Sequence, residues 1–259
     1  MRNIIASVLV ALAFSTPLAA QTDEAARLLD EGNRLFREGN FEQARIAYEE
    51  VTDLGVESGN VYYNLGNAYF RLDRLGKAML NYQRAFRYFP KDAALTHNMD
   101  LVRSRSRDQL SVLPKPIWAK WWNGFVDTVG LRRLFWLGVV GWLAGLALFG
   151  RRLHLRAIST AARRLAIVLV VVGGLAGAGA VATSAARTDN VSAVVTADRA
   201  DVHEEPSSDS RVVIVVHEAL VVDVLRNDGD LLQVRLPNGI TGFVEPGTIE
   251  TIQAVRRTE

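Results

Sequence analysis

Two apolar stretches in the middle of this 259-residue chain constrain its fold more than any other feature. They span Leu134–Phe149 and Leu165–Ala185, and each approaches the ~20 residues that an α-helix needs to cross ~30 Å of hydrocarbon. A helix satisfies its own backbone hydrogen bonds in lipid, so the pattern predicts transmembrane helices at 134–150 and 165–186. The sequences on either side differ in pattern, so we expect a two-helix hairpin that joins two unlike soluble modules.

Basic side chains concentrate beside these stretches and predict how the hairpin is oriented. Positive charge in a short connection favours the cytoplasmic side of a membrane. We therefore expect a cytoplasmic loop at 151–164, with both modules on the periplasmic side of a bacterial inner membrane. The bases of this loop are Arg151, Arg152, Arg156, Arg163 and Arg164, and they outnumber Arg132 and Arg133 at the opposite end of the first stretch.

Residues 1–20 have the composition of a secretory signal peptide. Arg2 precedes the apolar run Ile4–Phe14, and small residues follow up to Ala20. We expect cleavage near Ala20, with an uncleaved anchor as the alternative. In both cases the residues that follow would be translocated.

A 34-residue repeat organises residues 23–107. The repeat-equivalent pairs are Gly32 and Gly66, Ala44 and Ala78, and Tyr48 and Tyr82. Together with the run Tyr62–Tyr69, this period resembles tetratricopeptide repeats, in units 25–58 and 59–92 followed by a capping helix. The resemblance implies an α-helical array that binds peptides. Because about three units are usually needed, we expect marginal stability alone or help from a partner.

The resemblance also implies a concave peptide-binding groove. Family members that hold a C-terminal carboxylate pair asparagine with a base, but here Leu29, Ala94 and Asn98 occupy the positions expected for bases. We therefore expect amide hydrogen bonds to a peptide backbone. The alternative is that Asn64 and Asn67 merely cap or solvate helices. The predicted groove residues are Leu29, Asn33, Phe36, Tyr63, Asn64, Asn67 and Phe70, with His97 on the same face.

The segment 108–133 predicts a linker and an interfacial helix. Pro114 and Pro116 stiffen its first part. Large apolar side chains then recur at helical spacing, and tryptophan favours the headgroup zone of a membrane. A buried soluble helix is the alternative. The recurring residues are Trp118, Trp121, Trp122, Phe125 and Val129.

Each apolar stretch carries a GxxxG pattern, at Gly141–Gly145 and Gly173–Gly177. Such glycines let two helix backbones approach closely in lipid. They indicate packing within the hairpin or against another membrane protein. The alternative is that glycine is simply common in membrane helices.

Residues 190–250 change to short β runs separated by turn residues, which predicts a small β-barrel. The runs Ala200–Ser208, Leu231–Leu236 and Asn238–Val244 resemble bacterial SH3 (SH3b) domains. The family often has Arg-Ser-Gly before the proline and an aromatic pair in the fourth strand, where this chain has His203-Glu204-Glu205 and Leu231-Leu232. An acidic, aromatic-poor surface favours protein contact or a spacer role over binding to anionic wall polymers.

Sequence patterns for catalysis are missing. The chain has no cysteine, its four histidines lack metal-ligand spacing, and no nucleophile-elbow, Walker A or dinucleotide fingerprint occurs. We therefore expect no enzyme, no cofactor and no metal site. The net charge of +2 arises from the membrane flanks, which gives no support to nucleic-acid binding.

The order of modules resembles the BatE-type proteins of bacterial aerotolerance operons. The resemblance implies a non-catalytic membrane scaffold with membrane-anchored von Willebrand A-domain proteins as partners, and through them a MoxR-type AAA+ ATPase. One alternative is a peptidoglycan-associated module that recruits cell-wall machinery. A receptor for an extracytoplasmic ligand is disfavoured, since the short loop could not relay a signal.

Overall fold

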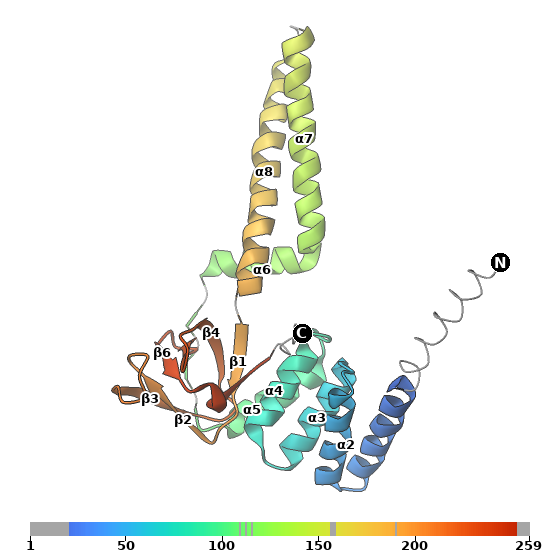
Figure 1. The fold of residues 1–259 in the computed structure, drawn as a ribbon. Helices are drawn as coiled ribbons and strands as arrows, with labels where there is room; N and C mark the ends of the chain where they lie inside the picture. The colour runs from blue at the N-terminus through green and yellow to red at the C-terminus, as the bar shows by residue number, and fades with distance from the viewer. Residues whose placement is uncertain are drawn as a thin grey trace, which may run out of the picture. The chain divides into compact units, whose positions relative to one another are not determined.

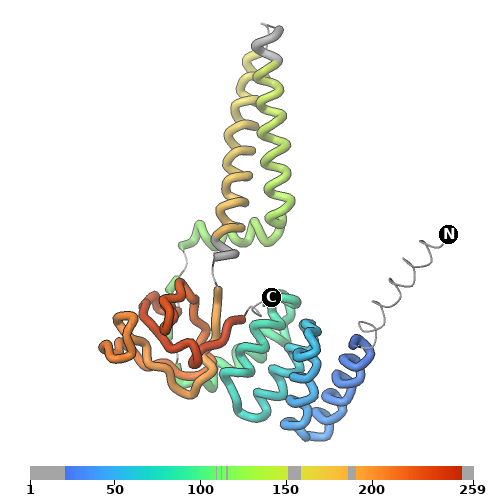
Figure 2. Tube along the Cα trace, viewed as in Figure 1, coloured from blue at the N-terminus to red at the C-terminus, as the bar shows by residue number. Residues whose placement is uncertain are grey.

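The computed structural model describes residues 21–108, 110–111, 113–114, 116–155, 159–189 and 191–252 (coloured in Figure 1), and Figure 2 traces the same backbone as a tube. The predicted signal peptide, 1–20, lies outside the described residues. The chain divides into two compact units (Figure 1). One combines Met1–Val112 with Val191–Glu259, and the other is Leu113–Asn190.

The first part of the first unit is the predicted helical array. A helix over 21–37 is followed by α2 (Phe41–Asp53), α3 (Gly59–Arg71), α4 (Leu75–Phe86) and α5 (Ala93–Arg105). Side-chain oxygens of Ser58 and Asp92 accept hydrogen bonds from the backbone N–H groups of Val61 and Leu95, which caps α3 and α5.

Two glycines set the spacing of paired helices in the array. A Cβ at Gly32 would lie 2.5 Å from the ring of Tyr48, and one at Gly66 would lie 2.6 Å from the ring of Tyr82. Each tyrosine is about 1% exposed, so its ring fills the space that the missing side chain leaves. The 34-residue repeat is therefore a repeated glycine–tyrosine contact.

The C-terminal part of this unit is a seven-stranded antiparallel sheet in the order β3-β2-β6-β5-β4-β1-β7. Strands β3 and β7 are its outer strands in the described residues, so the predicted barrel is not closed. The strands are β1 (Val191–Val195), β2 (Arg199–His203), β3 (Val212–His217), β4 (Val221–Asn227), β5 (Leu232–Arg235), β6 (Thr241–Val244) and β7 (Ile249–Thr251).

The array and the sheet share one hydrophobic core. Val194, Ala219 and Ile252 of the sheet belong to the same buried cluster as Met79 and Tyr82 of α4. Strand β1 lies against α4, and a Cβ at Gly76 would meet the carbonyl oxygen of Val195 at 2.8 Å. The two sequence modules are thus one folded unit, which no local pattern in either of them predicted.

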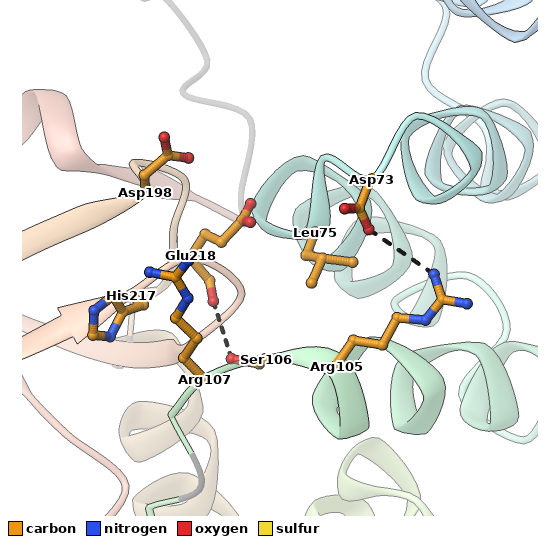
Figure 3. A pocket seen from close by; sticks show the side chains of 8 residues that line it. All are labelled: Asp73, Leu75, Arg105, Ser106, Arg107, Asp198, His217 and Glu218. Carbon is orange, nitrogen blue, oxygen red and sulfur yellow. Dashed lines mark hydrogen bonds and ion pairs between the residues drawn. The ribbon is translucent and has the colours of Figure 1, made fainter.

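Polar contacts hold the same junction (Figure 3). The backbone N–H of Gly76, in the first turn of α4, donates to Oε2 of Glu218 at 2.8 Å. Ser106 donates from Oγ to the backbone carbonyl of Glu218 at 3.1 Å. Asp108 accepts from the backbone N–H of His217 and lies 2.9 Å from Nδ1 of that residue. Glu218 and Asp108 therefore fix the loop after β3 to the array.

The second unit contains α6 (Ile117–Val129), α7 (Leu131–Leu155) and α8 (Thr160–Asp189). Within α7 and α8, residues 131–150 and 160–185 are long and apolar enough to cross a membrane, with mean hydropathies of 1.6 and 2.5. Both helices run past the predicted spans of 134–150 and 165–186. Residues 151–155 and 160–164 of the predicted loop are accordingly helical.

Glycines line the contact between α7 and α8. A Cβ at Gly173 would lie 2.6 Å from the backbone nitrogen of Trp142, and one at Gly145 would lie 2.9 Å from the carbonyl oxygen of Ala166. Gly138, outside the predicted motif, is equally close to the backbone of Gly177. Gly145 and Gly173, one from each GxxxG pattern, therefore permit close packing within the hairpin. A Cβ at Gly141 would come no closer than 3.9 Å to its neighbours, and one at Gly177 would have no atom within 4 Å.

Helix α6 divides its aromatic residues between two environments. Trp118 and Trp121 are 71% and 78% exposed. Trp122 instead donates from Nε1 to Oγ1 of Thr183 at 2.9 Å and lies against Gly179 of α8. The predicted single apolar stripe is thus split, with Trp122 anchoring α6 to α8.

Replacing Gly173 by alanine is expected to loosen the hairpin, because the new Cβ would collide with backbone rather than with a movable side chain. Overpacking of this kind costs about 1–3 kcal/mol. Heating the protein in detergent micelles, with helical circular dichroism as the readout, should show a lower midpoint than for wild type. Gly150→Ala is the control, since no atom lies within 4 Å of a Cβ there. Equal midpoints for both variants would contradict the packing described.

Replacing Gly76 by valine is expected to separate the sheet from α4, since its Cβ would meet the backbone of Val195 and Thr196. Hydrogen exchange of the amides in β1 and α4 should become faster than in wild type. Gly247→Ala, in the short 3₁₀ helix between β6 and β7 and with open space around its Cβ, should leave the exchange unchanged. Unchanged protection in the Gly76 variant would show that the junction does not stabilise either part.

Candidate peptide-binding groove

A small pocket opens between the helix over 21–37, α2 and α3. Its volume is about 130 Å³. Four of the seven predicted groove residues line it, whereas Leu29, Tyr63 and Phe70 are partly buried and pack against the core. The lining residues are Asn33, Phe36, Arg37, Tyr48, Asn64 and Asn67.

Asparagine and tyrosine side chains form a repeated hydrogen-bonded row along the array. Oδ1 of Asn33 accepts from the hydroxyl of Tyr48 at 3.0 Å and from Nδ2 of Asn64 at 2.9 Å. One repeat later, Oδ1 of Asn67 accepts from the hydroxyl of Tyr82 at 2.8 Å and from Nδ2 of Asn98 at 3.1 Å. We call these six side chains the asparagine row.

The row extends the repeat beyond its second unit. Asn98 stands 34 residues after Asn64, just as Asn67 stands 34 after Asn33. Helix α5 therefore contributes to the asparagine row like the first helix of a third repeat, in addition to capping the array. Asn98 was predicted only as the position of a missing base, although its 34-residue distance from Asn64 was a sequence signal for this role.

The row leaves unused hydrogen-bonding capacity. An asparagine amide offers two donors at Nδ2 and two acceptor sites at Oδ1. Both acceptor sites are taken on Asn33 and Asn67, while in the described residues no protein group bonds to Nδ2 of either one. Such donors can bond the carbonyl groups of an extended peptide. The bonds within the row hold its side chains in place, and the unused donors suit the backbone carbonyl groups of a peptide.

Burial keeps the tyrosines of the row in their donor form. It raises the pKa of Tyr48 to about 12 and also raises the pKa of Tyr82. The neutral phenol therefore persists at all physiological pH values, and each hydroxyl continues to hold its asparagine acceptor in place.

A second cavity, of about 390 Å³, lies within the same unit at the junction of array and sheet (Figure 3). Three acids and two arginines face it, and an ion pair at 3.9 Å joins Arg105 to Asp73. No group of three or more potential metal-ligating side chains occurs in the part of the chain that the structure describes. The cavity is lined by Asp73, Leu75, Arg105, Ser106, Arg107, Asp198, His217 and Glu218.

Comparison with known proteins identifies one segment. Residues 59–92, which contain α3 and α4, match the family described as Tetratricopeptide repeat. No curated protein matches the chain. Tetratricopeptide repeats are typically non-catalytic modules for protein–protein interaction, and this is the function that the match indicates.

Replacing Tyr48 by phenylalanine is expected to change the response of stability to alkali. Folding favours the neutral phenol, so the contribution of Tyr48 is complete below the unfolded pKa of about 10 and is lost as pH rises through about 12. Urea titrations at pH 9 and pH 11.5 should therefore show a smaller loss of unfolding free energy in Tyr48→Phe than in wild type.

The matched control for this titration is Tyr88→Phe, whose ring is 43% exposed. This variant should lose as much unfolding free energy between pH 9 and pH 11.5 as the wild type does. At pH 9 the Tyr48 variant should be less stable than wild type by about 1 kcal/mol, for the lost hydrogen bond to Asn33. Identical pH dependence in all three proteins would contradict the assigned role.

Proposed function

We propose that this protein is a non-catalytic, membrane-anchored scaffold whose tetratricopeptide groove binds an extended segment of a partner protein in the periplasm. The observation that carries the proposal is the asparagine row. Its asparagines lie on three helices, and Asn33 and Asn67 line the pocket with no protein group bonded to Nδ2 in the described residues. Leu29, Tyr63 and Phe70 support the row from the core side, and the other predicted groove residues contact the partner.

The fold supports a hairpin topology for the membrane segment. The array precedes α7 and the sheet follows α8, yet both belong to one compact unit with a shared core. Parts of one folded unit lie on the same side of a membrane. If α7 and α8 span it, they must cross in opposite directions, and the basic connection between them favours the cytoplasmic side. The unit itself is then periplasmic, in agreement with the proposed signal peptide.

Exposure favours lipid as the surroundings of the hairpin. Val168, Val171 and Leu175 are 53%, 52% and 69% exposed. Apolar side chains exposed along such long helices are typical of lipid-facing surfaces. The exposed Trp118 and Trp121 of α6 would lie at the headgroups of the inner membrane.

The proposal extends to the complex that the scaffold serves. We take the C-terminal sheet as an SH3b-like module that adds a second protein contact, and the chain as a BatE-type protein. Its partners would then be membrane-anchored von Willebrand A-domain proteins and, indirectly, a MoxR-type AAA+ ATPase in aerotolerance. The support is the order of modules, which covers nearly all of the chain.

Crosslinking in cells, followed by purification from solubilised membranes and mass spectrometry, tests this function. The Asn64→Ala/Asn98→Ala variant removes two members of the asparagine row without touching the buried tyrosines. We expect A-domain proteins or an AAA+ ATPase with the wild type, and at least a roughly fivefold lower yield with the variant, since residues central to an interface each contribute more than about 1 kcal/mol.

Gln43→Ala is the matched control, because Gln43 is an exposed amide on α2 outside the groove lining. It should leave the yield unchanged. Recovery of wall enzymes or peptidoglycan fragments in equal amounts from all three proteins would overturn the proposal and place the function in the sheet.

A further inference from the structure

Three arginines recur at the repeat interval on the first helices of the repeats. Arg37, Arg71 and Arg105 are each 34 residues apart, and each is the last residue of its helix. A base at a helix C-terminus complements the helix dipole, which by itself explains a few tenths of a kcal/mol at each site. Their contacts indicate more than this, and we call the three side chains the arginine row.

Two members of the arginine row are connected to the groove pocket. Arg37 lines the groove pocket itself, together with Phe36. The guanidinium of Arg71 lies 4.2 Å from the ring centroid of Phe41, and that ring packs edge-on against Phe36 at 5.2 Å.

The third arginine stacks on a ring of α3 and lines the second cavity rather than the groove pocket. The guanidinium of Arg105 lies 4.5 Å from the ring centroid of Phe70, the repeat equivalent of Phe36. A guanidinium stacked on an aromatic face keeps its N–H edge available for an anion.

The arginine row differs from its neighbours in its lack of close carboxylates. Arg27, Arg34 and Arg103 form ion pairs with helical acids at 2.6–2.7 Å. Arg37 and Arg71 form no ion pair in the residues that the structure describes, and Arg105 reaches Asp73 only at 3.9 Å. Arg37 and Arg71 are exposed bases beside the groove pocket without a paired acid in the described residues, and such bases are complementary to negative charge on a ligand.

We propose that the groove selects an acidic partner segment, with the asparagine row bonding its backbone and the arginine row bonding its Asp or Glu side chains. The inference rests on the proposed function and specifies the partner's chemistry. The positions expected for bases hold Leu29, Ala94 and Asn98, whereas the available bases lie at the ends of the helices. Acidic side chains along a bound segment would therefore take the place of the C-terminal carboxylate that other members of the family hold.

The test is selection of a phage-displayed library of random 12-residue peptides on the full chain in detergent micelles. Peptides enriched by the wild type should contain more Asp and Glu than the input library. A selected acidic peptide should bind Arg37→Gln/Arg71→Gln about fivefold more weakly than wild type, at about 0.5 kcal/mol for each exposed charge pair. Its affinity for wild type should fall as salt is raised.

Arg34→Gln is the matched control, since Arg34 lies on the same helix as Arg37 but pairs with Glu31 and Glu38. It should bind the acidic peptide as wild type does. Enriched peptides without an acidic bias, or a bias that survives in Arg37→Gln/Arg71→Gln, would overturn the inference. A partner lost in Asn64→Ala/Asn98→Ala but kept in the arginine variant would leave the proposed function standing and remove the charge selection alone.

Discussion

The packing of the C-terminal sheet on α4 is the contact on which the rest of the first unit depends. Two repeats and one further helix form a short array, and arrays of this kind need their ends covered. Val194, Ala219 and Ile252 provide that cover by entering the array's own core. Glu218 adds a carboxylate at the N-terminal turn of α4, where the helix dipole favours negative charge. A segment more than 100 residues away in sequence thus completes the array.

This arrangement has consequences for the groove. The sheet covers α4 and the segment after α5. The asparagines of the asparagine row lie on the first helices of the repeats and stay open. The row is internally bonded before any ligand binds, which lowers the cost of ordering side chains on binding. The same tyrosines that fill the glycine gaps also hold the asparagines, so the stability of the array and the geometry of the groove share one set of contacts.

The second unit relies on a different principle. If α7 and α8 span a membrane, no hydrophobic drive acts between them in lipid, and close backbone packing replaces it. Gly138, Gly145 and Gly173 permit that approach, and Trp122 ties α6 to α8 through Thr183. Apolar side chains such as Val168 and Leu175 stay exposed along α8 outside this packing.

Sequence alone determined the local elements: the 34-residue period predicted the helical array, the apolar stretches predicted two long helices, and the β runs predicted short strands. Strand β2 alternates strictly between polar and apolar residues, with Ala200 and Val202 as its only apolar side chains. Only the tertiary structure decided three features. The sheet is not closed into a barrel, the sheet and the array form one unit, and Asn98 pairs with Asn67. Periodicity reports which face of an element is apolar, whereas the identity of the surface that covers this face depends on contacts between residues distant in the chain.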